Sequence, residues 1–287
     1  MYNHSKKIIE GYDVHTLSDG NSQLQVVPQR GGMVSGLILD GSQILYMDGG
    51  TLYDTSKNIR GGIPILFPIC GGLTDGAYTM DGKTYHMKQH GFARDHSWDI
   101  EDITANENDA SMTIALHDDP DTYGEYPFHF DIRIKYTIGK GGLAIDTGIA
   151  NKDDRPMPFC LGFHPYFKVS DKSRFSADIH AEKRISTIPG GIVDGKINYD
   201  ADEVNISYRE LKDNICRLSG AQTGLHVELG FDGIFKYVTL WSLKGRDFVC
   251  VEPWTAYADS MNTQKDLHVI EPGTCHNSRI SICANKI

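Results

Sequence analysis

The sequence predicts an all-β fold, either a sandwich or a barrel, built from many short strands. Short apolar or alternating runs recur along the chain, and Gly, Asp, Asn and Pro bound them, as expected for strands joined by turns. Few stretches show helical periodicity. No linker, composition break, repeat or low-complexity tract interrupts the chain, so residues 1–287 are predicted to form one domain.

The predicted strands are rich in Val, Ile, Leu, Phe and Tyr, which pack well on a pleated surface. The first half of the chain contains Leu24–Val27, Val34–Leu39, Ile44–Met47, Trp98–Ile103, Ser111–Leu116 and Phe128–Ile138. The second half contains Leu143–Ala150, Met157–Phe163, Arg174–Ala181, Leu225–Leu229, Tyr237–Leu240, Phe248–Glu252, Leu267–Ile270 and Ser278–Cys283. So many strands at close spacing indicate a sandwich or a barrel.

Turn residues predict how some strands connect. Asn106–Asp109 is a turn between two runs, and Gly139–Gly142 closes a hairpin. Asp81-Gly82 is a dipeptide typical of a two-residue hairpin turn. Residues 182–215 are polar and weakly patterned. They are expected to form a surface excursion or irregular edge strands, with no role in chemistry.

Charge and cysteine content limit the class of protein. The formal net charge of -10 argues against nucleic acid or an anionic membrane as a partner, because both require basic surface. A phosphorylated small molecule stays compatible, since a local arginine pair can oppose the global charge. The six cysteines are scattered without a C-x-x-C pair, and the first ten residues lack a signal peptide's apolar stretch. We therefore expect a reduced, cytoplasmic protein.

A histidine stands out in Gly162–Phe167, which reads GFHPYF. His164 lies between two aromatic residues at the end of an apolar run, and Pro165 after it favours an extended backbone. A histidine can give or take a proton near neutral pH. On its own, however, a packed structural role is the better explanation of this histidine.

A glutamate is presented in the same manner by Phe248–Trp254, which reads FVCVEPW. Glu252 ends an apolar run, a proline follows, and an aromatic residue is near. His164 and Glu252 both end an apolar run and precede a proline. This shared pattern predicts that their side chains face each other as an acid–base pair.

Three further segments supply groups that a sugar site requires. Arg60 precedes a glycine pair and an apolar run, His90 and Arg94 share a short polar segment, and Asp232 lies in the tight turn of Gly230–Gly233. Each has a plainer explanation, as a surface ion pair or a turn former. Together with the predicted pair, they provide planar donors and acceptors for hydroxyl groups.

Several familiar motifs fail. Gly76–Thr84 ends in Gly-Lys-Thr, but its glycine spacing is wrong for a phosphate loop, and no dinucleotide fingerprint occurs. His86 and His90 stand four apart without the glutamate of a zinc-binding helix. The sequence therefore predicts neither a cofactor nor a catalytic metal.

The ordered set of motifs resembles the aldose 1-epimerase (galactose mutarotase) family. The matching pieces are Asn58–Gly62, Gln89–Arg94, Gly162–Phe167, Gly230–Asp232 and Val251–Glu252. The resemblance implies a large antiparallel β-sandwich, with His164 as general acid, Glu252 as general base, and sugar contacts from Arg60, His90 and Asp232. Gly-Gly-Ile-Pro after Arg60, and Arg94 after His90-Gly-Phe-Ala, resemble the hexose-6-phosphate 1-epimerase branch.

The implied reaction is the interconversion of α and β anomers of an aldohexose or its 6-phosphate. Two other classes stay open: a non-catalytic carbohydrate-binding or regulatory protein, and a glycoside hydrolase pairing Glu252 with Asp232, Asp259 or Glu271. A cupin-like metal isomerase is disfavoured because its H-x-H cluster is absent. The sequence does not distinguish a monomer from a homodimer.

Overall fold

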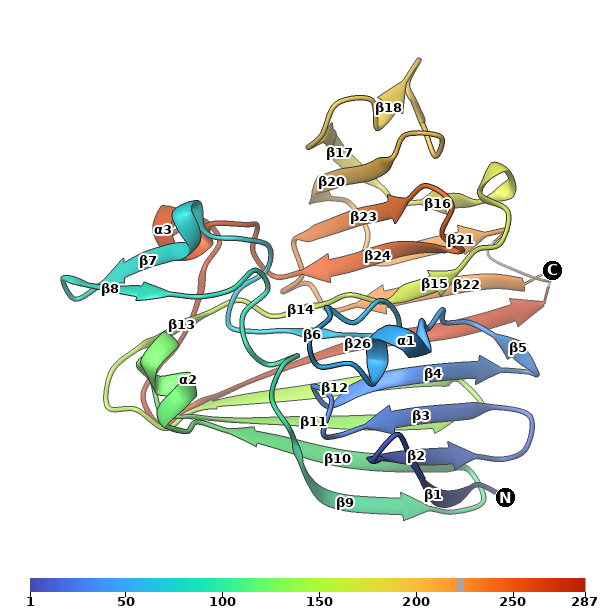
Figure 1. Cartoon of the computed structure of the whole chain (residues 1–287), viewed down its shortest axis with the longest axis horizontal. Coiled ribbons are helices and arrows are strands. Elements are labelled where there is room, and N and C mark those ends of the chain that lie inside the picture. The colour runs from blue at the N-terminus through green and yellow to red at the C-terminus, as the bar shows by residue number, and fades with distance from the viewer. Residues whose placement is uncertain (221–224, 287) are drawn as a thin grey trace.

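Two layers of antiparallel β-sheet form the molecule, described here over residues 1–220 and 225–286 of a computed structural model (Figure 1). The first layer begins with a five-stranded sheet in chain order. Its strands are β1 (Asn3–Ile9), β2 (Tyr12–Ser18), β3 (Gln23–Val27), β4 (Met33–Leu39) and β5 (Ser42–Gln43).

A seven-stranded sheet continues this layer. Its order is β17 (Ala181–Ser186), β20 (Glu203–Leu211), β23 (Tyr237–Leu243), β24 (Phe248–Trp254), β14 (Gly162–Phe163) and β6 (Ile65–Leu66), and β15 (Tyr166–Lys168) also pairs with β24. Isolated bridges, Val34 with Ile63 and Leu45 with Phe167, join the two sheets side by side. The layer therefore extends from β1 to β17.

The second layer is one eight-stranded sheet. Its order is β16 (Ser176–Asp178), β21 (Ile215–Ser219), β22 (Leu225–Phe231), β26 (Cys275–Lys286), β12 (Gly142–Asn151), β11 (Phe130–Gly139), β10 (Asp109–His117) and β9 (Asp99–Ala105). Side chains along β12 alternate between buried and half-buried, as on a sheet with one face in a core. One apolar cluster between the layers contains residues of both, such as Leu24, Leu240, Ile134 and Ile145.

Short elements decorate the sandwich. Three pairs of short strands are β7 (Ala77–Met80) with β8 (Lys83–His86), β13 (Met157–Phe159) with β25 (His268–Ile270), and β18 (Ile192–Val193) with β19 (Lys196–Ile197). The helices are α1 (Gly49–Leu52), α2 (Pro120–Glu125) and α3 (Ser260–Thr263), with single 3-10 turns at Thr74–Gly76 and Lys172–Arg174. In the part of the chain described, no helix is long and apolar enough to cross a membrane.

The predicted fold class, a large antiparallel β-sandwich, is confirmed. The hairpins at Asp81-Gly82 and Gly139–Gly142 form as predicted. Two predicted strands are instead broken, because the chain changes partners within each. Met157–Phe163 leaves β13 at Cys160 to join β14, and Arg174–Ala181 passes from β16 in the second layer to β17 in the first.

Residues 182–215 are more regular than predicted. They contain β20, a nine-residue strand that pairs with β23 from Glu203 to Arg209 inside the seven-stranded sheet. Sequence analysis also missed β1, because all seven of its residues are exposed and no alternation marks it. Ile44–Met47, a predicted strand, forms only the bridges made by Leu45 and Met47.

Candidate active site

His164 lies at the junction of β14 and β15, with backbone partners on both sides. Gly162 pairs with Trp254 of β24 and with Leu66 of β6, and the His164 N–H donates to the Pro64 carbonyl at 3.0 Å. Pro165, which has no N–H to offer the sheet, separates the two short strands. The histidine is thus held on a stiff, extended segment, as its sequence predicted.

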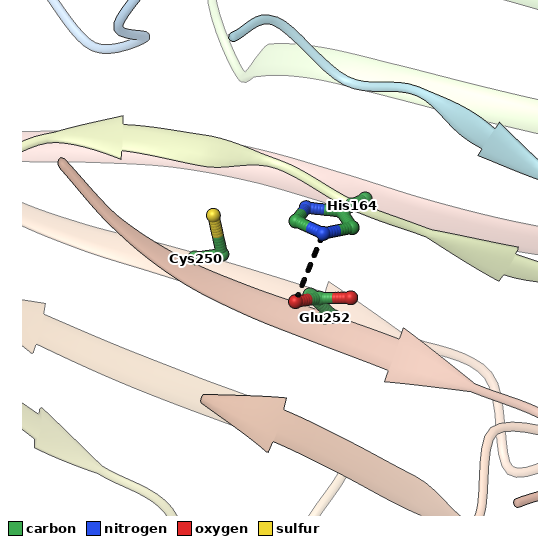
Figure 2. Close-up of side chains that lie close together, drawn as sticks. All are labelled: His164, Cys250 and Glu252. Carbon is green, nitrogen blue, oxygen red and sulfur yellow. Dashed lines mark ion pairs between the residues drawn. The ribbon is translucent and has the colours of Figure 1, made fainter. Parts of the chain in front are cut away.

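Glu252 lies on β24 and faces His164. The Nε2 atom of His164 is 3.3 Å from Oε1 of Glu252 (Figure 2). The other carboxyl oxygen, Oε2, accepts a hydrogen bond of 3.2 Å from the Trp254 indole. His164 is only 7% exposed and Glu252 only 1%, so neither has much water around it. The predicted facing pair is therefore present in the geometry.

Burial sets the protonation of the pair. It lowers the pKa of His164 well below its usual value, with further lowering from His90 and the Arg94 charge. It raises the pKa of Glu252 well above its usual value. Burial disfavours the doubly protonated pair, which has a net positive charge, and the fully deprotonated pair, which has a net negative charge. The pair therefore shares one proton near neutral pH. That proton can reside on either partner with no change in net charge.

His90 contributes a neutral ring with a fixed proton. Its Nδ1 accepts the Gly71 backbone N–H at 3.0 Å, so Nε2 carries the hydrogen. Burial, followed by the Arg94 charge, lowers the pKa of His90 to about 3. The ring lies edge-on to His164, with centroids 5.7 Å apart. His90 is therefore a hydrogen-bond donor in the site and not a cation.

The two predicted arginines both border the site. The Arg60 guanidinium lies over the Trp241 ring, 5.1 Å from its centroid. Arg94 donates to the Gln89 carbonyl at 2.9 Å, while its Nε is buried without a hydrogen-bond partner. Within residues 1–220 and 225–286, neither forms an ion pair with an acid. Both guanidiniums therefore keep donor capacity for a ligand.

These side chains enclose a pocket of about 280 Å³. Its lining includes Arg60, His90, Arg94 and the His164–Glu252 pair, together with residues of strands β20 and β23. The residues that sequence analysis missed here are Glu203, Asn205, Thr239 and Trp241. Glu203 accepts the Trp241 indole N–H at 2.6 Å, and the buried Thr239 hydroxyl has no hydrogen-bond partner. The missed signal was the alternation of polar and apolar residues in Glu203–Tyr208.

Asp232, which the sequence predicts to contact a sugar together with Arg60 and His90, does not line this pocket. It follows β22 in the second layer, whereas Glu252 lies in the first. Its carboxylate accepts the Arg279 backbone N–H at 2.6 Å. It borders a different hollow, beside Asp146 and Arg279. The carboxylate therefore connects the turn that follows β22 to β26.

Cys250 joins the pair from two positions earlier on β24. His164, Cys250 and Glu252 each offer one donor atom, and these atoms lie within 4.8 Å of one another (Figure 2). Burial raises the pKa of the Cys250 thiol well above its usual value.

Known proteins share both the fold and the sequence pattern. The family model for aldose 1-epimerase matches residues 13–282. The Slr1438 protein of Synechocystis sp. PCC 6803 is 31% identical, with each chain covered over 100% and a TM-score of 0.91. A galactose mutarotase-like protein of Clostridium acetobutylicum has the same fold at 18% identity, with a TM-score of 0.86 over 100% of this chain and 99% of its own.

One curated relative is named after a phosphorylated sugar. A proposed glucose-6-phosphate 1-epimerase of Cenchrus ciliaris is 31% identical over 152 residues, which is 50% of this chain and 43% of that protein. The match to the family model extends across both sheet layers and includes each segment that lines the pocket. The chain belongs to the aldose 1-epimerase family.

Proposed function

We propose that the protein is an aldose 1-epimerase that interconverts the α and β anomers of an aldohexose. The observation that carries this proposal is the His164–Glu252 pair, 3.3 Å apart and bordering a polar pocket. Anomer exchange opens the bond between C1 and the ring oxygen, turns the C1–C2 bond and recloses the ring. It needs one proton removed from the C1 hydroxyl and one given to the ring oxygen.

The one-proton pair matches this stoichiometry. With the proton on His164, the imidazolium donates to the ring oxygen while the Glu252 carboxylate accepts the C1 hydroxyl proton. The open-chain aldehyde is then held beside a neutral imidazole and a protonated carboxyl, which is the form that burial favours. Reclosure on the opposite face of C1 reverses both transfers. Positioned acid–base groups of this kind contribute about 10²–10⁴-fold in rate.

Arg60, His90 and Arg94 are proposed to bind the sugar. The His90 Nε2–H is a donor for a hydroxyl oxygen, because its other nitrogen is occupied by Gly71. Two guanidiniums without acidic partners in the described structure favour an anionic group, since arginine matches phosphate oxygens. We therefore propose an aldohexose 6-phosphate as the preferred substrate, in line with the name of the Cenchrus ciliaris relative.

Polarimetry tests the proposal. Freshly dissolved α-D-glucose and α-D-galactose, and the glucose 6-phosphate anomers in a coupled assay, are followed with catalytic amounts of protein. We expect faster approach to the same equilibrium, fastest for the 6-phosphate. Acceleration of only the neutral sugars would overturn the phosphate assignment, and acceleration of none would favour a binding or regulatory role.

The three acids suggested as partners of Glu252 in a glycoside hydrolase lie outside this pocket, while Glu203, which does line it, accepts the Trp241 indole N–H. Asp232 lies at the other hollow, Asp259 accepts bonds from Thr74, and Glu271 follows β25, so none borders this pocket. Release of monosaccharide from a disaccharide would restore that alternative.

A further inference from the structure

His164, Cys250 and Glu252 form a compact set of three different donor atoms. Cys250 and Glu252 stand two apart on β24, so their side chains emerge on the same face of the strand. His164 reaches them from the neighbouring segment between β14 and β15, and all three are buried (Figure 2). The anomer exchange proposed above uses two of these groups and gives the cysteine no task.

An imidazole nitrogen, a thiolate sulfur and a carboxylate oxygen are all ligands that zinc takes in proteins. Zinc bonds of about 2.1 Å in a tetrahedron place neighbouring ligand atoms about 3.4 Å apart. The Nε2–Oε1 separation is already 3.3 Å, and all three donors lie within 4.8 Å of one another. Small rotations of the side chains therefore bring the set to bonding distance.

The charges also balance. Binding of Zn²⁺ releases the thiol proton and the proton held by the His164–Glu252 pair to solvent, leaving one thiolate and one carboxylate on the ion. The filled site is then neutral, which suits a buried position beside Arg60 and Arg94. Magnesium and calcium require six or more oxygen ligands, which this set cannot supply. The pocket bordering His164 and Glu252 leaves room for a fourth ligand.

We propose that His164, Cys250 and Glu252 bind a zinc ion that inhibits the enzyme. A zinc ion on this set occupies the lone pairs that the acid and the base would use, so metal and sugar exclude each other. The binding claim stands on the three donor atoms, whereas the inhibition claim rests on the proposed anomer exchange.

Metal binding is measured first, without any sugar. Titration with Co²⁺, and its displacement by Zn²⁺, is followed by the near-ultraviolet absorption of a cobalt–thiolate bond, and Zn²⁺ affinity by calorimetry. We expect one ion per chain with thiolate absorption. Cys250→Ser should lose that absorption and weaken Zn²⁺ binding at least about tenfold, because loss of even an outer-shell partner costs this much.

Cys216→Ser is the matched control. Cys216 is also fully buried, but it lies on β21 in the other layer. It should keep the wild-type affinity and absorption. Cys250→Ala and Glu252→Gln repeat the test with different packing, and circular dichroism shows that each variant is folded. No Zn²⁺ binding by wild type, or equal affinity in folded Cys250 variants, would overturn the site.

Inhibition is measured second, as the Zn²⁺ concentration that halves anomer exchange at several sugar concentrations. We expect this half-inhibiting Zn²⁺ concentration to rise with the sugar concentration. In Cys250→Ser it should be at least about tenfold higher than in wild type, with the rate of each protein expressed relative to its own rate without metal. Zinc that binds without inhibiting would overturn the inhibitory role. A protein that binds zinc but exchanges no anomers would refute the proposed function and leave the metal site intact.

Discussion

His164 and Glu252 share one proton in a place where water solvates neither charge. Burial lowers the pKa of the imidazole and raises the pKa of the carboxyl, so each charged partner depends on the other. The two forms of the pair differ only in where the proton lies. In the proposed reaction, the charged form of the pair accompanies the closed ring and the neutral form accompanies the open chain. Burial keeps these two forms close in free energy, which favours catalysis.

The first prediction concerns the pH dependence of kcat/KM. The acid limb, where a second proton enters the pair, should lie below the ordinary histidine pKa, because burial and the neighbouring His90 and Arg94 oppose that proton. The alkaline limb, where the last proton leaves, should lie well above the ordinary glutamate pKa. Exchange rates measured from about pH 4 to pH 10 check this. An activity that declines on acidification already from pH 7 would contradict it.

The second prediction concerns Glu203, which holds the Trp241 indole beneath the Arg60 guanidinium. Glu203→Ala removes the acceptor and should raise KM for the sugar about tenfold, the value of one hydrogen bond with a charged partner. Glu203→Gln keeps an acceptor and should restore most of the loss. Steady-state kinetics measure both, and an unchanged KM in Glu203→Ala would refute the positioning role.

For single residues, sequence analysis identified those whose immediate neighbours in the chain define the backbone conformation. His164 and Glu252 each precede a proline and end an apolar run, and those features fix an extended backbone. Asp232 failed because a short turn motif does not say which layer its turn belongs to. Glu203 was missed because its strand carries a polar face, and only the fold shows that this face lines a pocket.

At the scale of elements, β14, β15 and β24 matter most, since they bring the pair together. The strands that sequence analysis located best have one buried face and clear alternation, such as β11 and β12. The strands that it predicted as single elements but that are two, Met157–Phe163 and Arg174–Ala181, are those in which the chain passes from one sheet to another. Partner exchange of this kind is a tertiary event that local patterning does not encode.

The third prediction concerns the loop that presents His90. Gly91 has a φ of +72°, and a Cβ there would lie 2.1 Å from the Phe67 carbonyl oxygen. Gly91→Ala should lower the free energy of unfolding by more than the roughly 1 kcal/mol expected from backbone strain alone. Urea unfolding measures the loss, together with a drop in sugar affinity.

Gly82→Ala is its matched control. Gly82 has a φ of +75° in the β7–β8 turn, but a Cβ there meets nothing within 4 Å. The free energy of unfolding of Gly82→Ala should fall only by the contribution of backbone strain, and its sugar affinity should equal that of wild type. Equal destabilisation of both variants would show that the close approach at Phe67 is unimportant.

At the scale of the whole molecule, one apolar cluster spans both layers, and we infer from it that the chain is one domain. Burial is the main cause of the lowered pKa of His15, His90, His268 and His276. Two histidines of this group, His15 and His90, are buried, and His268 and His276 are half-buried. In the unfolded chain these groups titrate near 6.5. Below that pH these four sites bind more protons in the unfolded state than in the folded state, so their contribution to stability falls on acidification.

The fourth prediction follows from this decrease in stability at acidic pH. The urea midpoint should be higher at pH 7.5 than at pH 5, and His268→Gln should reduce the difference. His180→Gln is the control, since that ring is exposed and paired with Asp178 and Asp213. Equal or greater stability at pH 5 would contradict the prediction.

The central claim, that His164 and Glu252 exchange anomers as an acid–base pair, is tested most directly by NMR at equilibrium. Magnetisation transfer between the α and β C1 protons of glucose 6-phosphate reports exchange without any coupling enzyme. Wild type should accelerate the transfer, while His164→Gln and Glu252→Gln, shown to be folded, should each lose most of it. Transfer at the wild-type rate by either variant would contradict the claim.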